Sequence, residues 1–460
     1  MFCPSMQMKY SAILLGVTVF YTVNSFQFSN ERCIVFPRTR VALSLHSTKE
    51  ERPSHWIVPE GVSFGSLDKL QFRVRDSGIS TRNRDEKVEL CTVATKAIGL
   101  NFADVFCLLG LYMAANQVRG SADFCPGLEY SGVIVDDPTG TYLPGQRVLG
   151  FTRFGAFSDI VQVPPHYLYP LPDRWTFVQG AGFVVQALTA WHGLVQIGRM
   201  PLVDKDTTYV TLIHSAAGGV GLWAAELAAR RGAVVIGLVG SADKVKVFED
   251  RILHLSPRSC AMIRGTEGTF RGRLATLLSR VHNCTIPSDI PIKRTLSYLR
   301  EEEKGVDIVM ESLGGQYFTD SFEALNRGGS LVTFGSTSYV NPGLDINKIR
   351  LIWRYLTRPR IDPGTLTSRN IQLGGFNLIY LTDKPKELRQ ELYDLICCLN
   401  GKTGNDAANT PNAVLLDEVT PPIIGDVFDF RTEAIQALER LKSGKTVGKV
   451  VLDNSYNKGH

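Results

Sequence analysis

Residues 86–175 alternate apolar and polar side chains in short runs. These runs read KVELCTVATKAI, YSGVIVDD, QRVLGFT and FSDIVQVP. Turn-forming residues separate them, as at Pro138-Thr139-Gly140 and Pro144-Gly145. Alternation with a period of two is typical of half-buried strands. The pattern predicts a small, mostly β, partly open barrel.

The pattern changes near residue 180 to apolar strands that alternate with amphipathic helices. The run YVTLIH (209–214) leads into a glycine cluster and then a helix with apolar residues at i, i+3, i+4 and i+7. These helix positions are Val220, Trp223, Ala224, Leu227 and Ala228. Further strands are predicted at 233–239, 306–311, 330–336 and 370–376. Strands alternating with helices predict a doubly wound parallel sheet with right-handed crossovers.

Residues 250–304 fit this alternation poorly. One helix and one strand are expected here, but the stretch is longer and contains the polar piece HNCTIPSDIPIKR (282–294). A long structureless loop is uncommon in a compact domain. We therefore predict an insertion near 265–300, with the polar piece as a surface loop.

The C-terminal part predicts two helices and a final strand. The helices read KELRQELYDLICCLN and TEAIQALERLKSG, and the strand is KVVLD (449–453). A barrel of short strands needs partners at its open edges. We therefore expect this tail to return to the first, β-rich domain.

The first 50 residues have the features of a targeting leader. Residues 11–23 are almost wholly apolar, and Val23 and Ser25 suit a cleavage site after Ser25, as in a secretory signal peptide. The apolar run is shorter than the ~20 residues that a membrane-spanning helix needs. Residues 26–50 are rich in Arg, Ser and Thr and poor in acids, which is the composition of a transit peptide.

A signal peptide followed by a transit segment resembles the bipartite plastid leaders of algae with secondary plastids. Phe26, directly after the expected cut, adds to the resemblance. We predict import into a plastid. A simple signal peptide, with a secretory or membrane-associated protein, is the alternative. No integral membrane span is expected in the mature chain.

Composition narrows the class of protein. Apolar residues make up 44% and charged residues 21% of the 460 residues, as in globular proteins of about two domains. The net charge of +5 is small. The sequence also lacks the stripe of basic residues with interleaved aromatics that would indicate nucleic-acid binding. The nine cysteines are scattered without a CxxC pair, which argues against a structural zinc site.

The glycine cluster is the clearest chemical motif. Glycines between a strand and a helix allow a tight turn and a close approach of the backbone to phosphate, and the helix amides then bind the pyrophosphate. We predict a dinucleotide site with the cofactor-binding residues Ser215, Ala216, Gly218, Gly219, Val220 and Gly221.

The end of the second strand indicates which nicotinamide binds. An acid about 20 residues after the glycines would hold the ribose 2′-hydroxyl of NADH. Here the strand ends on Val239 and Gly240, and Ser241 and Lys244 follow. These two can contact a 2′-phosphate, which favours NADPH. Asp243 could be the displaced acid and keeps NADH as the alternative.

Several ordered segments resemble the zinc-free quinone oxidoreductase branch of the medium-chain dehydrogenase/reductase superfamily. Within it the chain is similar to the vesicle amine transport protein homologues. The segments that carry the resemblance are Gly99–Asp104 with Gly110–Tyr112, Pro126–Gly132, Gln186–Trp191, Ser215–Gly221, Gly305–Val309 with Leu313–Gly315, Gly375–Leu378 and Gly448–Leu452. Together they cover roughly residues 86–455.

The resemblance implies a GroES-like catalytic domain made from both ends of the chain and a Rossmann domain between them. The expected boundaries are the leader at 1–50, the first catalytic part at 51–178, the Rossmann NADPH-binding domain at 179–376 and the second catalytic part at 377–460. Zinc members carry Gly-His-Glu where this chain has Gly127-Leu128-Glu129. We therefore expect no metal, since the histidine ligand is missing.

The resemblance places Asn101 and Asp104 near the nicotinamide and the substrate, and we expect these two residues and Tyr112 to be catalytic. Asn101 could polarise a carbonyl and Tyr112 could donate a proton. Asn101 and Asp104 could instead cap a helix, and Tyr112 could pack at a turn. Phe106 replaces a tyrosine of some members. Further cofactor contacts are expected at Thr189, Gly335, Ser336, Asn377 and Lys449.

The resulting hypothesis is an NADPH-dependent oxidoreductase acting on a quinone or the C=C bond of an α,β-unsaturated carbonyl. One alternative is an enoyl-thioester reductase, for which Lys348, Arg350, Arg354 and Arg358 could form a basic patch. Another is a nucleotide-binding, membrane-associated protein with little turnover, since fold does not fix function. The resemblance also suggests a homodimer.

Overall fold

The structure is a computed structural model. It describes residues 52–74, 89–118, 122–265, 268–335, 348–402 and 416–455, with the backbone alone at 348, 350 and 351 and in two leader strands. Those strands, β1 (Ser11–Leu14) and β2 (Val17–Phe20), pair antiparallel within a unit, Met1–Glu51, that is separate from Arg52–His460. The rest of the predicted leader lies outside the described residues.

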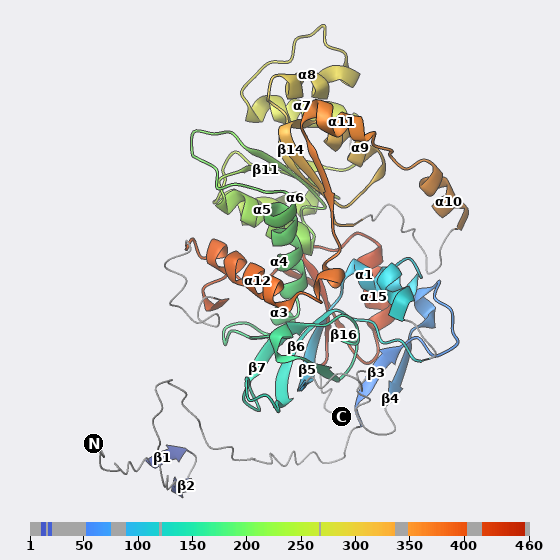
Figure 1. Ribbon diagram of the computed structural model, residues 1–460, viewed down its shortest axis with the longest axis vertical. Helices are drawn as coiled ribbons and strands as arrows, with labels where there is room; N and C mark the ends of the chain where they lie inside the picture. The colour runs from blue at the N-terminus through green and yellow to red at the C-terminus, as the bar shows by residue number, and fades with distance from the viewer. Residues whose placement is uncertain are drawn as a thin grey trace. The chain divides into compact units, whose positions relative to one another are not determined.

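A six-stranded parallel sheet forms the centre of the cofactor domain (Figure 1). Its strand order is β12-β11-β10-β13-β14-β15, which is the doubly wound order with the first strand beside the switch point. The strands are β10 (Val210–His214), β11 (Val234–Val239), β12 (Cys260–Ile263), β13 (Val306–Glu311), β14 (Leu325–Thr333) and β15 (Gln372–Gly375). The predicted Rossmann-type sheet is confirmed, with β12 as a strand that the sequence pattern missed.

Helices cover both faces of this sheet, because successive strand residues point to opposite faces. Ile213 packs into one apolar cluster, whereas Val210 and Leu212 pack into another on the opposite face. The first cluster contains residues of α4 (Val184–Trp191), α5 (Gly219–Arg230), α6 (Ala242–Ile252) and α12 (Pro385–Leu399). The second contains residues of α7 (Phe270–Val281), α8 (Thr295–Glu301) and α9 (Gly315–Glu323).

The insertion predicted near 265–300 is narrower than expected. Its flanks form α7 and α8, and Leu274, Leu278, Leu296 and Leu299 of these helices are fully buried in the core. Between these two helices, the connection at 282–291 has no helix or strand. The prediction was wrong for the flanks. The polar residues between the two helices interrupt the apolar pattern, so the apolar positions of α7 and α8 were not recognised as helix faces.

The catalytic domain is a seven-stranded, mostly antiparallel sheet with both ends of the chain in it. Its order is β16-β17-β5-β6-β7-β9, and β8 pairs with β5. The strands are β5 (Cys91–Gly99), β6 (Glu129–Asp136), β7 (Arg147–Phe151), β8 (Ile160–Val163), β9 (Leu168–Pro170), β16 (Ile424–Asp429) and β17 (Lys449–Asp453). The predicted barrel-like domain and the return of the tail to it are confirmed.

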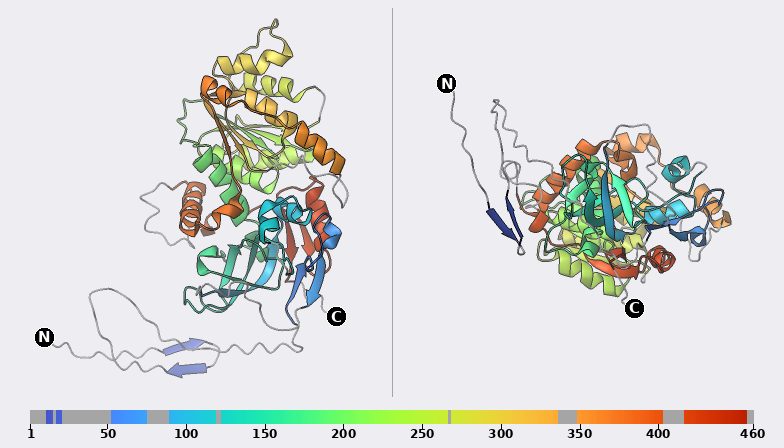
Figure 2. Two further views of the ribbon diagram at one scale, coloured as in Figure 1. Left: turned by 45° about the vertical axis from the view of Figure 1, so that its right-hand side comes forward. Right: turned by 90° about the horizontal axis from the view of Figure 1, so that it is seen from below.

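Short helices and a hairpin complete this domain, which lies below the parallel sheet in both vertical views (Figures 1 and 2). The hairpin pairs β3 (Ser54–Ile57) with β4 (Gln71–Val74). The helices are α1 (Phe102–Leu108), α2 (Met113–Val118), α3 (Phe177–Gly180) and α15 (Ala434–Lys442). α12 lies outside the sheet and packs against α4 and α5.

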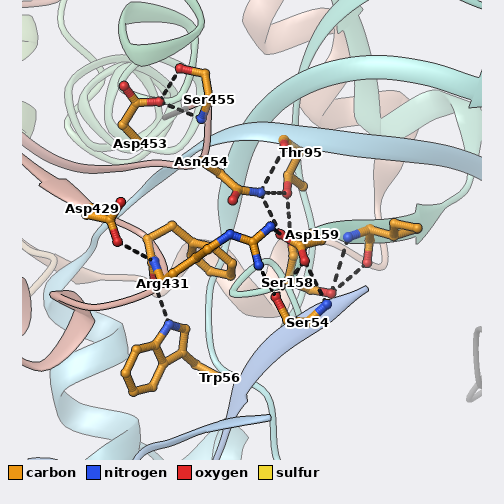
Figure 3. Close-up of polar contacts among 12 residues, drawn as sticks. Ser54, Trp56, Thr95, Ser158, Asp159, Asp429, Arg431, Asp453, Asn454 and Ser455 are labelled. Atoms are coloured by element: carbon orange, nitrogen blue, oxygen red, sulfur yellow. Dashed lines mark hydrogen bonds and ion pairs between the residues drawn. The ribbon is translucent and has the colours of Figure 1, made fainter. Parts of the chain in front are cut away.

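Polar contacts tie the first catalytic strand to the end of the chain (Figure 3). Ser54 donates hydrogen bonds from its amide and its hydroxyl to Asp159 Oδ2, both at 2.6 Å. Asn454, just after β17, donates to Asp159 Oδ1 at 2.8 Å, and Arg431 Nη1 donates to Ser54 Oγ at 3.1 Å. Segments about 400 positions apart are thus held together, because buried or half-buried polar groups need partners.

Candidate cofactor and substrate cavity

A cavity of about 730 Å³ lies where the two domains meet. The cofactor domain contributes the glycine loop after β10, and the catalytic domain contributes the first turns of α1. The amide of Gly448 donates to the carbonyl of Ala217 at 2.8 Å and so joins the domains directly at the glycine loop. This position agrees with the rule that ligands bind at the carboxyl ends of strands at a switch point.

The glycine loop has the geometry of a phosphate cradle. Gly218 is the N-cap of α5, which begins at Gly219, so free amides of the first helical turn face the cavity. A Cβ at Gly219 would collide with the Gln186 side chain, and one at Gly221 would collide with the Ser215 carbonyl. Ser215 has a positive φ of 53°, which only a well-supported turn tolerates.

Five of the six predicted loop residues line the cavity. They are Ser215, Gly218, Gly219, Val220 and Gly221. Ala216 is the exception, because it is fully buried and its amide donates to Leu238 O at 3.0 Å. The prediction of a cofactor contact at Ala216 was wrong, since its side chain packs beneath the loop.

Gln186 is a cavity residue to which the sequence reading gave no role. It lies on α4 with 7% of its surface exposed, and its Oε1 atom has no hydrogen-bond partner among the described residues. An unsatisfied buried acceptor is costly, so a donor from a bound molecule would stabilise it. This unpartnered oxygen beside Gly219, the free α5 amides and the absent Cβ atoms together fit a dinucleotide.

The end of β11 carries a cluster of cations. Lys244 is 6% exposed and donates to Gly444 O at 2.8 Å. Neither Lys244 nor Ser241 lines the 730 Å³ cavity, so the predicted direct contact with its contents is not seen. Burial, and then the charge of Arg264, lower the pKa of Lys244.

Arg264 was missed in the sequence because it follows β12, the strand that the pattern did not show. Its guanidinium lies against Gly240 at the end of β11. Burial lowers the pKa of Arg264, and no carboxylate among the described residues pairs with it. The Asp243 carboxyl is exposed and held by the Ser241 hydroxyl. Two neighbouring cations with one arginine unpaired suit a phosphate monoester.

Asn101 lines the cavity and is held from beneath by a buried ion pair. Its Nδ2 atom donates to Glu129 Oε1 at 3.0 Å, and its Oδ1 atom accepts from Lys449 Nζ at 3.0 Å. Glu129 and Lys449 form an ion pair with each other and are almost fully buried. Lys449 therefore does not reach the cavity wall, and its prediction as a cofactor contact was wrong. It positions Asn101 instead.

Asp104 is also buried away from the cavity. Its carboxylate accepts the amide of Asn101 at 2.7 Å and the amide of Gly127 at 3.0 Å, which stabilises the start of α1. Burial is the largest cause that raises the pKa of Asp104 to about 7. The alternative of a helix-capping residue is therefore the observed one, and direct catalysis by Asp104 is not supported.

Tyr112 and Asn377 meet on the cavity wall. The Tyr112 hydroxyl donates to Asn377 Oδ1 at 2.7 Å, although the residues are far apart in sequence. Burial is the main cause that raises the pKa of Tyr112 above its ordinary value, so the hydroxyl stays protonated at neutral pH. Both residues line the cavity, and their roles at the substrate and the cofactor stay predictions.

Of the remaining predicted cofactor contacts, Thr189 and Gly335 line the cavity and Ser336 does not belong to the described residues. Thr189 lines the cavity, and its hydroxyl donates to Val185 O at 2.6 Å. Gly335 lines it as well, and Phe106 adds an apolar wall. Ser336 lies outside the described residues.

Nothing in the described part of the chain gathers metal ligands. No group of three or more His, Cys, Asp or Glu side chains there could hold a metal ion. Leu128 lies on the cavity wall, and Glu129 is occupied by Lys449. The metal-free chemistry remains a prediction that rests on these side chains.

Over the described segments, no helix has both the length and the hydropathy to cross a bilayer.

Comparisons with known proteins agree with this architecture. The family model described as "Zinc-binding dehydrogenase" matches residues 219–380. The synaptic vesicle membrane protein VAT-1 homolog of Mus musculus is 25% identical over 395 residues, which is 85% of this chain and 81% of the relative.

Two solved structures show the same fold. A quinone oxidoreductase of Pseudomonas syringae has a TM-score of 0.61 at 20% identity and covers 87% of this chain and 99% of its own. A mycobacterial protein in complex with NADPH has a TM-score of 0.61 at 21% identity and covers 86% and 99%. The resemblance stated from the sequence motifs is therefore confirmed.

Proposed function

We propose that this chain, which belongs to the medium-chain dehydrogenase/reductase superfamily in its quinone oxidoreductase branch, is an NADPH-dependent reductase that needs no metal. Its substrate would be a quinone or the C=C bond of an α,β-unsaturated carbonyl compound. The observation that carries the proposal is the glycine loop, which opens α5 inside a cavity shared by both domains.

Different residues in and near the cavity would bind different parts of the cofactor. The α5 amides and the glycine loop would bind the pyrophosphate. Gln186 Oε1 would accept a hydrogen bond, and Arg264 with Lys244 would bind the 2′-phosphate. The nicotinamide, when bound, supplies the hydride.

Substrate binding falls to the opposite wall. Phe102, Phe106, Leu111 and Leu128 line it and would exclude water from the reacting atoms. Tyr112 keeps a proton on its hydroxyl because burial raises its pKa. It would give that proton to the substrate as negative charge develops on the carbonyl oxygen. The Asn101 amide, fixed by Glu129 and Lys449, would orient the carbonyl.

Titration and turnover of the full chain test the proposal. NADPH and NADH are titrated while protein fluorescence is followed, and NADPH oxidation is then measured with a panel of quinones, enones and pantetheine thioesters. We expect NADPH to bind at least about tenfold more tightly than NADH, because a charge-assisted contact contributes roughly 1.5–3 kcal/mol, and we expect a quinone or enone to be reduced. Tighter binding of NADH would overturn the choice of cofactor.

The same assay separates the alternatives. Tight NADPH binding without oxidation by any panel member would favour a nucleotide-binding protein with little turnover. Reduction of the thioester alone would favour the enoyl-thioester reductase. The basic residues considered for that activity lie on or next to a helix, α10 (Lys348–Leu356), outside the cavity lining.

Tyr112→Phe tests the proton donor. Removing the hydroxyl should lower kcat by about 10²-fold and leave the Kd for NADPH unchanged, because Tyr112 lies on the substrate side. Tyr380→Phe is the matched control, since Tyr380 is 41% exposed and does not line the cavity. An unchanged kcat in Tyr112→Phe would show that the hydroxyl serves only to hold Asn377.

A further inference from the structure

Helix α10 presents an apolar stripe to solvent. Ile349, Ile352, Trp353 and Leu356 stand at i, i+3, i+4 and i+7 and therefore share one face of the helix. Their exposed fractions are 82%, 60%, 66% and 59%. Singly exposed apolar residues are ordinary, but a contiguous exposed stripe indicates a binding surface.

No side chain of this stripe belongs to an apolar core cluster of the described residues. α10 lies in the crossover between the neighbouring strands β14 and β15, and Figure 1 shows it at the outer edge of the cofactor domain. The helix is thus not needed to fill the fold, and its stripe lacks a partner in the core.

Charge indicates what kind of partner would cover the stripe. From Lys348 to Arg360 the chain carries five basic residues and no acid. Arg358 lies over the Tyr355 ring, with its guanidinium carbon 3.9 Å from the ring centroid. A stripe with Trp and aliphatic side chains on one face, flanked by cations, is typical of helices that lie in the interface of an anionic membrane.

We propose that α10 docks this protein on an anionic lipid membrane. Ile349, Ile352, Trp353 and Leu356 enter the region between headgroups and acyl chains, and the exposed Arg358 and Arg360 just after the helix neutralise lipid phosphates. Pairing of α10 with α10 of a second copy is disfavoured, because it would bring two runs of basic residues together without an acid between them. The docking is independent of the proposed reductase activity.

Flotation of the full chain with vesicles tests the docking. The probes are vesicles of phosphatidylcholine alone and vesicles of phosphatidylcholine with phosphatidylglycerol. We expect the wild type to bind the anionic vesicles in preference to the neutral ones, and more weakly at high salt. Trp353→Glu and, separately, Ile349→Glu should each reduce the bound fraction about tenfold, because each puts a charge into the apolar interface.

Leu202→Glu is the matched control. Leu202 is 67% exposed, like Trp353, but lies in a loop before β10, so this change adds the same charge at another exposed apolar position. It should bind anionic vesicles as the wild type does. Since the leader is present in every variant, the difference between them reports on α10 alone.

Three results would overturn the proposal. The first is equal binding of the wild type and both α10 variants to anionic vesicles, and the second is no binding at all by the wild type. The third is a change of molecular mass by light scattering in the α10 variants with vesicle binding unaffected, which would identify α10 as an interface between copies. Thermal unfolding of each variant confirms that its fold is intact.

Discussion

Arg264 is the residue that most sharpens the choice between the two nicotinamide cofactors. It lies beside Lys244 against the end of β11 and pairs with no described carboxylate. Ser241 and Lys244 alone left the cofactor ambiguous, because Asp243 stands between them in sequence. The exposed position of the Asp243 carboxyl and the unpaired guanidinium shift the balance to a phosphate.

Arg264→Ala should weaken NADPH binding and leave NADH binding almost unchanged. Loss of a charge-assisted contact of roughly 1.5–3 kcal/mol raises the Kd for NADPH by about 10- to 100-fold. Fluorescence titration of both cofactors checks this. Arg327→Ala serves as the control, because the Arg327 side chain is 73% exposed. Equal weakening of NADH and NADPH would argue against a 2′-phosphate contact.

Asp104 should make stability depend on pH. Burial raises the pKa of its carboxyl from 3.8 to about 7, so the folded state binds its proton more tightly than the unfolded state. The resulting stabilisation is complete below a pH of 3.8 and is lost as the pH rises through about 7. The loss is on the order of 4 kcal/mol.

Urea unfolding at about pH 5 and about pH 8 measures this effect. The free energy of unfolding of the wild type should fall over this range by more than that of Asp104→Asn, which cannot titrate. Asp68→Asn, at a side chain that is 54% exposed, should keep the wild-type dependence. The same slope in Asp104→Asn as in the wild type would exclude Asp104 as its source.

At the scale of elements, α7 and α8 show why the helices after β12 were not predicted from the sequence. Each helix is short and carries polar residues on its outer side, so its apolar stripe is brief in sequence. In the fold both stripes close the same face of the sheet, because a doubly wound sheet must be covered on both faces. These helices are core elements, and only their connection is peripheral.

Leu278→Ala should therefore destabilise the protein by about 2–5 kcal/mol, as expected for a fully buried leucine. Leu278 has 0% exposure on α7. Ile292→Ala, at a residue that is 63% exposed between the two helices, should change the free energy of unfolding by less than about 0.5 kcal/mol. Denaturant unfolding measures both. A small effect of Leu278→Ala would support the original prediction of an inserted surface segment.

At the scale of the whole molecule, we propose that residues 1–50 direct the chain to a plastid. A reporter protein fused after residue 50 should reach the plastid in an alga with a secondary plastid, and Phe26→Ala should divert it, because the Phe follows the expected cut. Secretion of the unaltered fusion would support a simple signal peptide.

The homodimer also stays a prediction, which light scattering of the full chain can test.

The order of the domains could be predicted from the sequence for a local reason. Side-chain periodicity is set by backbone geometry, so alternating runs indicated the catalytic strands, and the strand before the glycine cluster indicated β10 and α5. The return of the tail was predictable because open sheet edges need partners. Ser215, Gly219 and Gly221 could be placed for the same reason, since a strand, a turn and a helix are consecutive in the chain.

Which polar side chains reach the cavity was decided only by the tertiary structure. Asp104 was predicted to be catalytic and Lys449 to contact the cofactor, yet both side chains are buried beneath the cavity. Gln186 and Arg264 gave no distinct signal, yet one faces the glycine loop and the other the end of β11. The direction of each side chain depends on contacts such as Lys449 with Glu129, which join residues about 320 positions apart. The sequence by itself determined the fold class and the position of the glycine loop, whereas packing between distant segments determined which side chains reach the cavity.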